Sequence, residues 1–577
     1  MILSYLDWGI IAIFFMLSLG IGVWSSKKAG KDLESFFLAG KDMPWWLLGI
    51  SMVATTFSTD TPNLVTDLVR QKGVSGNWAW WAFLLTGMLT VFVYARLWKR
   101  SDILTDIEFY ELRYSGKAAA FLRGFRALYL GLVFNVLVMG AVSLAAVKFG
   151  EIVLGVSGWI TLSVACSITL IYSALGGLKA VIITDFIQFI FAMVGSIWAT
   201  IHILSLPEIG GLANLVSHEN VVGKLSLFPD LSNPDAWIPV LFVPLAVQWW
   251  ASYYPGSEPG GGGYIAQRMF SAKDESHAMG ATFLFNIAHY AIRPWPWILI
   301  ALSSLIIFPE LSDIQNAFPD LPADKLGHDI AYPAMLTLLP SGLLGIVSAS
   351  LIAAFMSTMS TQLNLGASYL VNDFYYRFIR PDSSKKELVI IARIFTVVTI
   401  ILGASLGLIL KSAGQAFNLL LMIGAGTGLI YILRWFWWRI NAYTEITAMA
   451  SSLLVALYLN FSELDIASWV KIIIGVSLTT IIWVLTSFIT PQEDEETLRN
   501  FVDKVNPGGP GWKNYTSSSE SESWFVPKGI FLMALGCTAV YGFLLSMGHL
   551  IYGNEQAGIS LLFISFLAFF GIYKTWK

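Results

Sequence analysis

The sequence predicts an all-α protein that crosses a membrane many times. Of the 577 residues, 56% are hydrophobic and only 13% are charged, about half the charged fraction of a typical soluble protein. Apolar stretches long enough to span a bilayer recur from one end of the chain to the other. The net charge of -3 gives no sign of nucleic-acid binding. The two cysteines, Cys166 and Cys537, lie in apolar stretches and support neither a disulfide nor a metal site.

The expected spans follow one another along the whole chain, each about 17–30 residues long. The first has no basic region before it and no small-residue cleavage site after it, so we expect a retained span, not a signal peptide. About fifteen spans are expected, with about thirteen as the lower bound. They cover residues 5–25, 45–68, 78–98, 123–149, 154–175, 180–205, 237–254, 278–308, 341–372, 388–410, 415–436, 441–461, 466–489, 527–548 and 556–575.

Basic residues in alternate connections predict the orientation of the chain in a cell membrane. Lys and Arg are enriched in every second connection, Arg268 and Lys273 among them, whereas residues 206–236 and 309–335 hold one lysine each. Cytoplasmic loops carry the excess of basic residues. The N-terminus is therefore expected outside, and an odd number of spans places the C-terminus in the cytoplasm.

One stretch near the C-terminus is soluble in character. Residues 490–525 are acidic and rich in Gly, Pro and Ser. Such a composition is typical of a solvated segment. We expect a cytoplasmic linker that leads to two accessory spans.

The span over residues 45–68 contains a signal for a broken helix. The polar run TTFSTDTP crosses its middle, and Pro62 ends that run. Proline cannot donate a backbone hydrogen bond, and polar side chains compete for backbone groups. We expect an unwound stretch near 55–61, which membranes tolerate only where the backbone lines a cavity or a site.

A second break is expected after the span over 237–254. There the sequence VQWWASYY is followed by PGSEPGGGG, residues 255–263. Each broken helix opens a block of five spans, and an odd number of spans gives the two blocks opposite orientations. We therefore expect a five-plus-five inverted repeat. Its parts are an N-terminal flanking segment at 1–44, a first repeat at 45–205, an extracellular loop at 206–236, a second repeat at 237–436 and accessory helices at 437–577.

Four hydroxyls cluster in the run AAFMSTMST within the span over 341–372. On a helix, Ala354, Ser357, Thr358 and Thr361 share one face, and Ser360 flanks it. Hydroxyls inside a membrane bond a helix carbonyl, a neighbouring helix or a bound ion. So dense a cluster favours a site for a small hard cation such as sodium over simple helix contacts.

Several ordered motifs resemble one known family. They are FFLAGKDMPWW (36–46), TDIEFYELRY (105–114), YSALGGLKAVIITDFIQF (172–189), YIAQRMFSAKDESHA (264–278), AAFMSTMSTQLN (353–364) and NDFY (372–375). Together they resemble the sodium:solute symporters, relatives of the sodium–glucose cotransporters. The resemblance implies a LeuT-type inverted-repeat fold and import of a solute by alternating access. It also implies co-transported Na+, no organic cofactor and no enzyme activity.

The resemblance also implies positions for sodium. A first site would use the backbone carbonyls of Ala54, Phe57 and Ala354 with the hydroxyls of Ser357 and Thr358. A second sodium, found in some members, would use Asp185 with the hydroxyls of Ser357, Ser360 and Thr361. The alternative for Asp185 is a structural hydrogen-bond acceptor, so one or two sodium ions per cycle remain open.

The positions that align with the sugar-binding residues of the family argue against a neutral hexose, because several of them are apolar or aromatic. His289 and Arg293 lie four residues apart, and arginine binds carboxylates with two parallel hydrogen bonds. We therefore expect a small organic solute, with a sugar acid or carboxylate favoured. The alternative is that Arg293 pairs with Asp60 or Glu258. The candidate solute-binding residues are Asp60, Thr61, Trp80, Phe83, Trp249, Trp250, Tyr253, His289, Arg293 and Leu421.

Two other functions stay open from the sequence. A sodium-binding channel or sensor would keep the sodium residues without accumulating a solute. A proton-coupled carrier would use Asp60, Asp185 or His289 as titrating groups. A membrane enzyme is disfavoured, because the connections 206–236 and 309–335 hold no cluster of carboxylates or histidines. The expected partners are the solute, sodium and the lipid bilayer, with no nucleic acid, and no oligomeric state is predicted.

Overall fold

The computed structural model describes residues 3–29, 32–251, 259–319, 321, 326–410, 424, 426–462, 466–516 and 524–576. Within these ranges the chain is helical and forms no β-strand, apart from an isolated bridge between Met43 and Ala272. Among the described residues, ten helices are long and apolar enough to cross a membrane, and four shorter apolar helices accompany them. The predicted class of an all-α, many-span membrane protein is confirmed.

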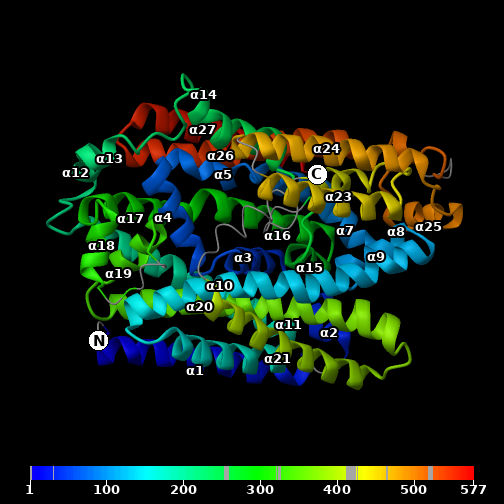
Figure 1. Cartoon of the computed structure of the whole chain (residues 1–577), viewed down its shortest axis with the longest axis horizontal. Coiled ribbons are helices and arrows are strands. Elements are labelled where there is room, and N and C mark those ends of the chain that lie inside the picture. Colours follow the sequence, from blue (N-terminus) through cyan, green and yellow to red (C-terminus); the bar gives the residue numbers. More distant parts are fainter. Residues whose placement is uncertain are drawn as a thin grey trace.

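The first 204 residues supply α1 to α11, which Figure 1 shows in blue to teal. Their bounds are α1 Tyr5–Ala29, α2 Leu33–Phe37, α3 Trp45–Thr55, α4 Asp60–Lys72, α5 Trp78–Trp81, α6 Leu84–Leu89, α7 Ala95–Ser101, α8 Phe109–Arg113, α9 Gly116–Leu128, α10 Asn135–Phe149 and α11 Gly158–Leu204. Short π-helical turns join several of them into longer rods.

The rest of the chain supplies the described helices from α12 to α27. Their bounds are α12 Leu212–Ser217, α13 Glu219–Val222, α14 Pro234–Trp237, α15 Tyr264–Phe270, α16 Glu275–Ile287, α17 Pro294–Ile307, α18 Leu311–Ala317, α19 Ala331–Leu336, α20 Leu343–Ser368, α21 Lys385–Ile409, α23 Ala442–Phe461, α24 Ser468–Ile489, α25 Glu495–Val505, α26 Val526–Ile551 and α27 Glu555–Thr575. Residues 415–423 and 425 of the predicted span at 415–436 lie outside the described residues.

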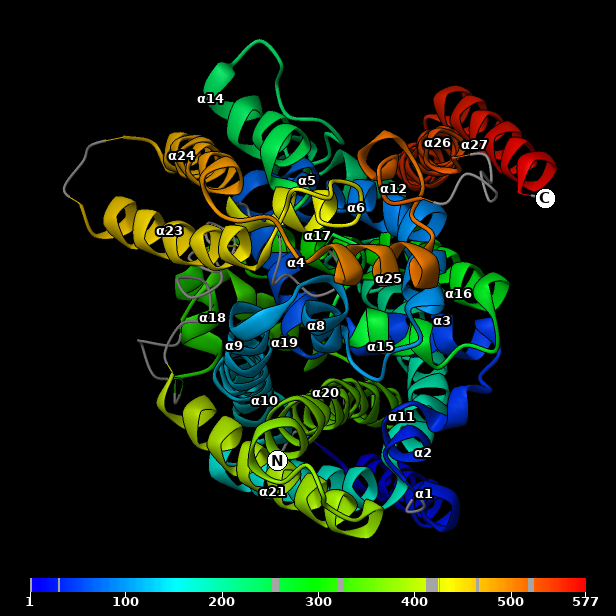
Figure 2. The same ribbon diagram turned by 90° about the vertical axis from the view of Figure 1, so that its right-hand side faces the viewer.

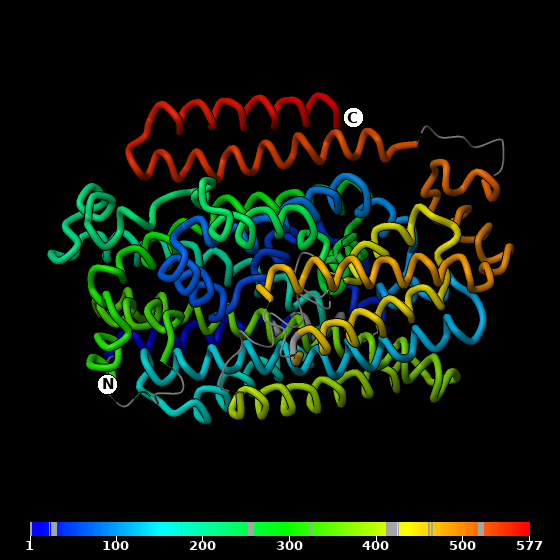
Figure 3. Tube along the Cα trace, turned by 45° about the horizontal axis from the view of Figure 1, so that its top comes forward, coloured from blue at the N-terminus to red at the C-terminus, as the bar shows by residue number. Residues whose placement is uncertain are grey.

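The helix α20 lies inside the bundle, where it packs against α1, α10, α11 and α21. Figure 2 shows α20 between the α1–α21 side and the group that contains α3, α15 and α19. The last two helices, α26 and α27, form a hairpin along an outer edge (Figure 3). The hydroxyl-rich helix therefore occupies the part of the fold most enclosed by protein.

Both predicted interruptions are present. The predicted span over 45–68 is interrupted between α3 and α4, where Thr56–Thr59 are not helical. Pro62 falls in the first turn of α4, where proline is tolerated. At the second interruption, the π-helical segment Pro244–Gln248 ends, and the next helix, α15, begins at Tyr264. Within this connection Gly261 has a φ of +72°, and a Cβ there would lie 2.8 Å from Thr90 Cγ2. A residue without a side chain is required at that point.

The rod α11 combines two of the predicted spans. It bends at Gly177, whose φ of +55° is not helical. A Cβ at Gly177 would lie 2.7 Å from the carbonyl oxygen of Phe36. The bend therefore depends on glycine, and it separates the predicted spans at 154–175 and 180–205.

Part of the segment 490–525 differs from the expected solvated linker. Residues 495–505 form α25, and the buried side chains of Leu498, Phe501, Val502 and Val505 repeat at helical spacing. The Phe501 ring lies 5.9 Å from Phe109 and 6.1 Å from Trp435, between ring centroids. The acidic composition of the segment led to the prediction of a solvated linker in spite of this apolar spacing. The structure instead shows α25 packed on the helix bundle.

Candidate functional site

The first break meets α20 through the hydroxyl of Thr358. Its Oγ1 lies 3.1 Å from the carbonyl oxygen of Thr55 and 3.2 Å from that of Phe57, and donates to them. These carbonyls are available because α3 ends at Thr55. The negative end of the α3 dipole also points to this position. A hydroxyl and two backbone carbonyls therefore converge at one buried point.

Two further hydroxyls at the break have no hydrogen-bond partner in the part of the chain that the structure describes. Ser58 is 2% exposed and Thr59 is 3% exposed. Buried hydroxyls are nearly always satisfied, so unsatisfied ones call for a water, an ion or a ligand. The donor set of neutral oxygens fits a hard cation.

The other members of the predicted first sodium site lie nearby but differ in role. Ala54 and Ala354 are buried on α3 and α20, and the carbonyl of Ala54 accepts from the amide of Phe57 at 3.2 Å. The hydroxyl of Ser357 donates to Asp185 Oδ1 at 2.6 Å. Ser357 therefore faces the second predicted site in this conformation.

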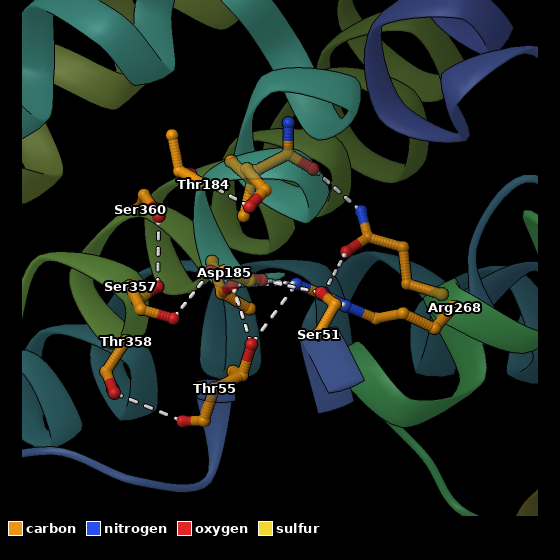
Figure 4. Close-up of polar contacts among 12 residues, drawn as sticks. Ser51, Thr55, Thr184, Asp185, Arg268, Ser357, Thr358 and Ser360 are labelled. Atoms are coloured by element: carbon orange, nitrogen blue, oxygen red, sulfur yellow. Dashed lines mark hydrogen bonds and ion pairs between the residues drawn. The ribbon is translucent and has the colours of Figure 1, made fainter. Parts of the chain in front are cut away.

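Asp185 of α11 lies between α3 and α20 (Figure 4). Ser51 Oγ donates to its Oδ2 at 2.5 Å, and Ser357 Oγ donates to its Oδ1. The guanidinium of Arg268 lies 3.5 Å from Oδ2, and both charged side chains are fully buried. Asp185 is therefore a hydrogen-bond acceptor and also half of a buried ion pair.

The sequence reasoning did not identify Arg268 as part of a site. The sequence predicts that Arg268 is one of the basic residues of a cytoplasmic loop, whereas the structure places it on α15 with its side chain buried. Its neighbours Ile265, Ala266, Met269 and Phe270 are apolar and buried. That apolar setting, directly after the second break, is the sequence signal that could have marked it.

Arg268 also bonds the hydroxyls of α3 and α20. Its Nη2 donates to Thr361 Oγ1 at 2.8 Å and to Thr55 Oγ1 at 3.3 Å, and its Nε donates to Ser51 Oγ at 3.2 Å. Ser360, the remaining residue of the predicted second sodium site, donates within its own helix to the carbonyl of Ser357 at 3.0 Å. Asp185, Ser357 and Thr361 are therefore gathered around one point, and the Ser360 hydroxyl is directed to its own backbone.

Arg293 holds the carbonyl end of α3. Its Nη1 donates to the carbonyl of Thr56 at 3.1 Å and to Thr56 Oγ1 at 3.1 Å, and its Nη2 lies 3.3 Å from His289 Nε2. Because arginine can only donate, His289 Nε2 must accept. The histidine proton then sits on Nδ1, 2.9 Å from Thr56 Oγ1. Arg293 and His289 form one network with the broken helix.

The remaining predicted solute residues are spread around the two breaks. The Trp80 ring lies 5.6 Å from that of His289, and Phe83 is buried. Asp60 is exposed at the start of α4, and Thr61 Oγ1 lies 3.5 Å from the amide of Ser58. Trp249 and Trp250 contact each other at 5.2 Å, and Tyr253, Leu421 and the proposed partner Glu258 lie outside the described residues.

Comparison with known proteins identifies the family. The model of the sodium:solute symporter family matches residues 36–455. The chain is 28% identical over 514 residues to a sodium/glucose cotransporter of Vibrio parahaemolyticus, which covers 86% of this chain and 92% of the relative. It is 27% identical to the sodium/mannose cotransporter SLC5A10 of Bos taurus, covering 76% of each chain. It is 25% identical to sodium/myo-inositol cotransporter 2 of Homo sapiens, covering 78% of this chain and 69% of that one.

A solved structure shows the same fold. It is the substrate-bound, outward-open state of a Na+-coupled sialic acid symporter, with a TM-score of 0.67 and 19% identity. The match covers 85% of this chain and 99% of that one. This match confirms the expected LeuT-type inverted-repeat architecture. The family model confirms the expectation of sodium-coupled transport, and membership of a transporter family agrees with the expectation of no enzyme activity. The chain belongs to the sodium:solute symporter family.

Proposed function

We propose that the chain imports a small organic solute by alternating access, driven by a sodium ion bound where α20 meets the break between α3 and α4. The observation that carries this proposal is the contact of the Thr358 hydroxyl with the carbonyls of Thr55 and Phe57. The ligands would be the carbonyls of Ala54, Phe57 and Ala354 and the hydroxyls of Ser357 and Thr358. Broken-helix carbonyls and the C-terminal end of a half-helix suit a cation.

Sodium binding at this position would link two parts of the fold. The carbonyl ligands come from the break, and the hydroxyl ligands come from α20. An ion that bridges them stabilises the conformation in which the break and α20 are close. A ligand shifts a conformational equilibrium only by its differential affinity for the two states, and such a bridging ion supplies that difference.

The class of solute depends on the role of Arg293. We expect an anion if its guanidinium is available to a carboxylate. Its hydrogen bonds to the carbonyl and hydroxyl of Thr56 instead support a role in holding the broken helix. The named relatives are cotransporters of glucose, mannose and myo-inositol. The solutes tested for transport must therefore include neutral sugars, inositols, sugar acids and carboxylates.

The test is uptake by the purified protein in liposomes. Each solute is offered with an inward sodium gradient, with equal sodium on both sides, and with an inward proton gradient without sodium. Accumulation that needs the sodium gradient supports the proposal. Accumulation driven by protons alone would establish the proton-coupled carrier. Sodium binding without accumulation of any solute would favour the sensor or channel.

A further inference from the structure

We propose that Arg268 is a tethered cation that competes with sodium for the oxygens around Asp185, so that a sodium ion binds there only when α15 withdraws the guanidinium. The inference rests on the proposed function, because it concerns a second ion in the same transport cycle. It adds a residue that the sequence assigned to a loop.

The first step is the identity of the oxygens around the guanidinium. One carboxylate oxygen, Asp185 Oδ2, lies 3.5 Å from Arg268 Nη2, and the hydroxyls of Thr361 and Thr55 lie at 2.8 and 3.3 Å from the same nitrogen. A carboxylate with two or three hydroxyls is also an oxygen shell that suits sodium. The guanidinium and a second sodium would therefore need the same atoms (Figure 4).

The second step is charge balance. Asp185 and Arg268 are both 0% exposed, so their charges meet in a medium of low dielectric constant. Among the described residues, Arg268 is the cation that forms an ion pair with Asp185. A sodium ion beside the intact pair would place two positive charges at one carboxylate. Repulsion therefore makes the two cations alternatives at this position.

The third step is where Arg268 lies in the chain. It belongs to α15, which directly follows the second break and the glycines at 260, 261 and 263. The polar partners of its guanidinium described above lie on α3, α11 and α20. Exchange of the guanidinium for sodium would remove the Arg268 hydrogen bonds to all three helices at once and leave the hydrogen bond of Gln267 to Asn364 of α20 in place. Sodium binding at Asp185 would thereby be coupled to movement of the segment after the second break.

The test is equilibrium binding of radioactive sodium to the purified protein, without any solute. In Arg268→Gln the carboxylate loses its internal cation. We expect sodium to bind at Asp185 at least ten-fold more tightly than in the wild type, or as one additional ion per chain. The matched control is Asp185→Asn/Arg268→Gln, which keeps the site neutral and should lack this gain.

The outcomes separate the two proposals. Sodium binding by Arg268→Gln identical to that of the wild type would overturn the competition, and so would an equal gain in the double variant. If the wild type binds no sodium and Arg268→Gln binds one ion, the competition at Asp185 holds and the proposed function, with the transport cycle built on it, fails.

Should Arg268→Gln not fold, Arg268→Met provides the second measurement. Methionine has no charge to pair with Asp185, so sodium binding should be stronger than in the wild type. Unchanged sodium affinity in Arg268→Met would overturn the proposal.

Discussion

At the scale of single residues, two buried arginines bond different parts of the candidate site. Arg268 neutralises Asp185 and bonds the hydroxyls of α3 and α20. Arg293 bonds the end of α3 through Thr56 and is stacked over Trp297 at 5.3 Å. A buried charge is tolerated only when it is paired or fully hydrogen-bonded. Both residues therefore contribute to the shape of the broken helix.

Replacement of Arg293 tests whether it serves structure or the solute. Arg293→Gln removes charged hydrogen bonds to Thr56, each of which contributes about 1.5–3 kcal/mol to stability. We expect a lower melting temperature and equal changes in uptake of neutral and anionic solutes, with Arg293→Lys as the milder control. A loss confined to anionic solutes would contradict this and show that Arg293 binds the carboxylate.

The sequence predicts some residues of the site better than others. Hydroxyl spacing predicts that Ser357 and Thr358 lie on one span and close together, because helical periodicity is local, whereas Asp185 of α11 was predicted only from the resemblance to a known family. The partnership of Arg268 with Asp185 joins positions far apart in the chain and follows only from the tertiary fold. The bonding of Arg293 to the carbonyl of Thr56 likewise depends on how α17 approaches the break.

At the scale of elements, the helices at the two breaks end near proline, glycine and polar residues. Pro62 and its polar neighbours predicted the first break, and glycines predicted the second. The bend in α11 at Gly177 is equally local, since its φ of +55° suits glycine. The docking of α25 was missed because acidic composition was given more weight than the apolar spacing of Leu498, Phe501, Val502 and Val505.

Gly177 provides a direct test of the bend. Gly177→Ala forces a side chain into positive φ and places Cβ 2.7 Å from the carbonyl oxygen of Phe36. We expect a loss of about 1–3 kcal/mol, measured as a lower melting temperature. The control is Gly9→Ala on α1, where a Cβ meets nothing within 4 Å. Equal melting temperatures for the two variants would refute the role of the bend.

The docked position of α25 has its own test. Phe501→Ala removes a buried ring that contacts Phe109 and Trp435, a change that typically costs about 3–5 kcal/mol. We expect faster protease cleavage within residues 490–525. Arg499→Ala, which removes only an exposed pair with Glu495, should be cleaved at the wild-type rate. Equal cleavage of both variants would mean that α25 does not depend on this packing.

At the scale of the whole molecule, composition and the order of spans were sufficient to predict the class, and the two breaks predicted the repeat architecture. The physical reason is that a bilayer permits few solutions for an apolar chain, so topology follows from span length and broken helices. The solute does not follow in the same way. We propose that a few side chains near the breaks recognise it, and several of these are apolar or aromatic, unlike the polar set expected for a hexose carrier.

The measurement that tests the central claim most directly is the sodium dependence of solute uptake in Thr358→Ala, beside Thr358→Ser and the wild type. Loss of one hydroxyl ligand should raise the sodium concentration for half-maximal uptake about ten-fold or more, which corresponds to about 1.4 kcal/mol. Thr358→Ser keeps the hydroxyl and should retain nearly normal sodium dependence. A Thr358→Ala protein with the sodium dependence of the wild type would contradict the proposed site.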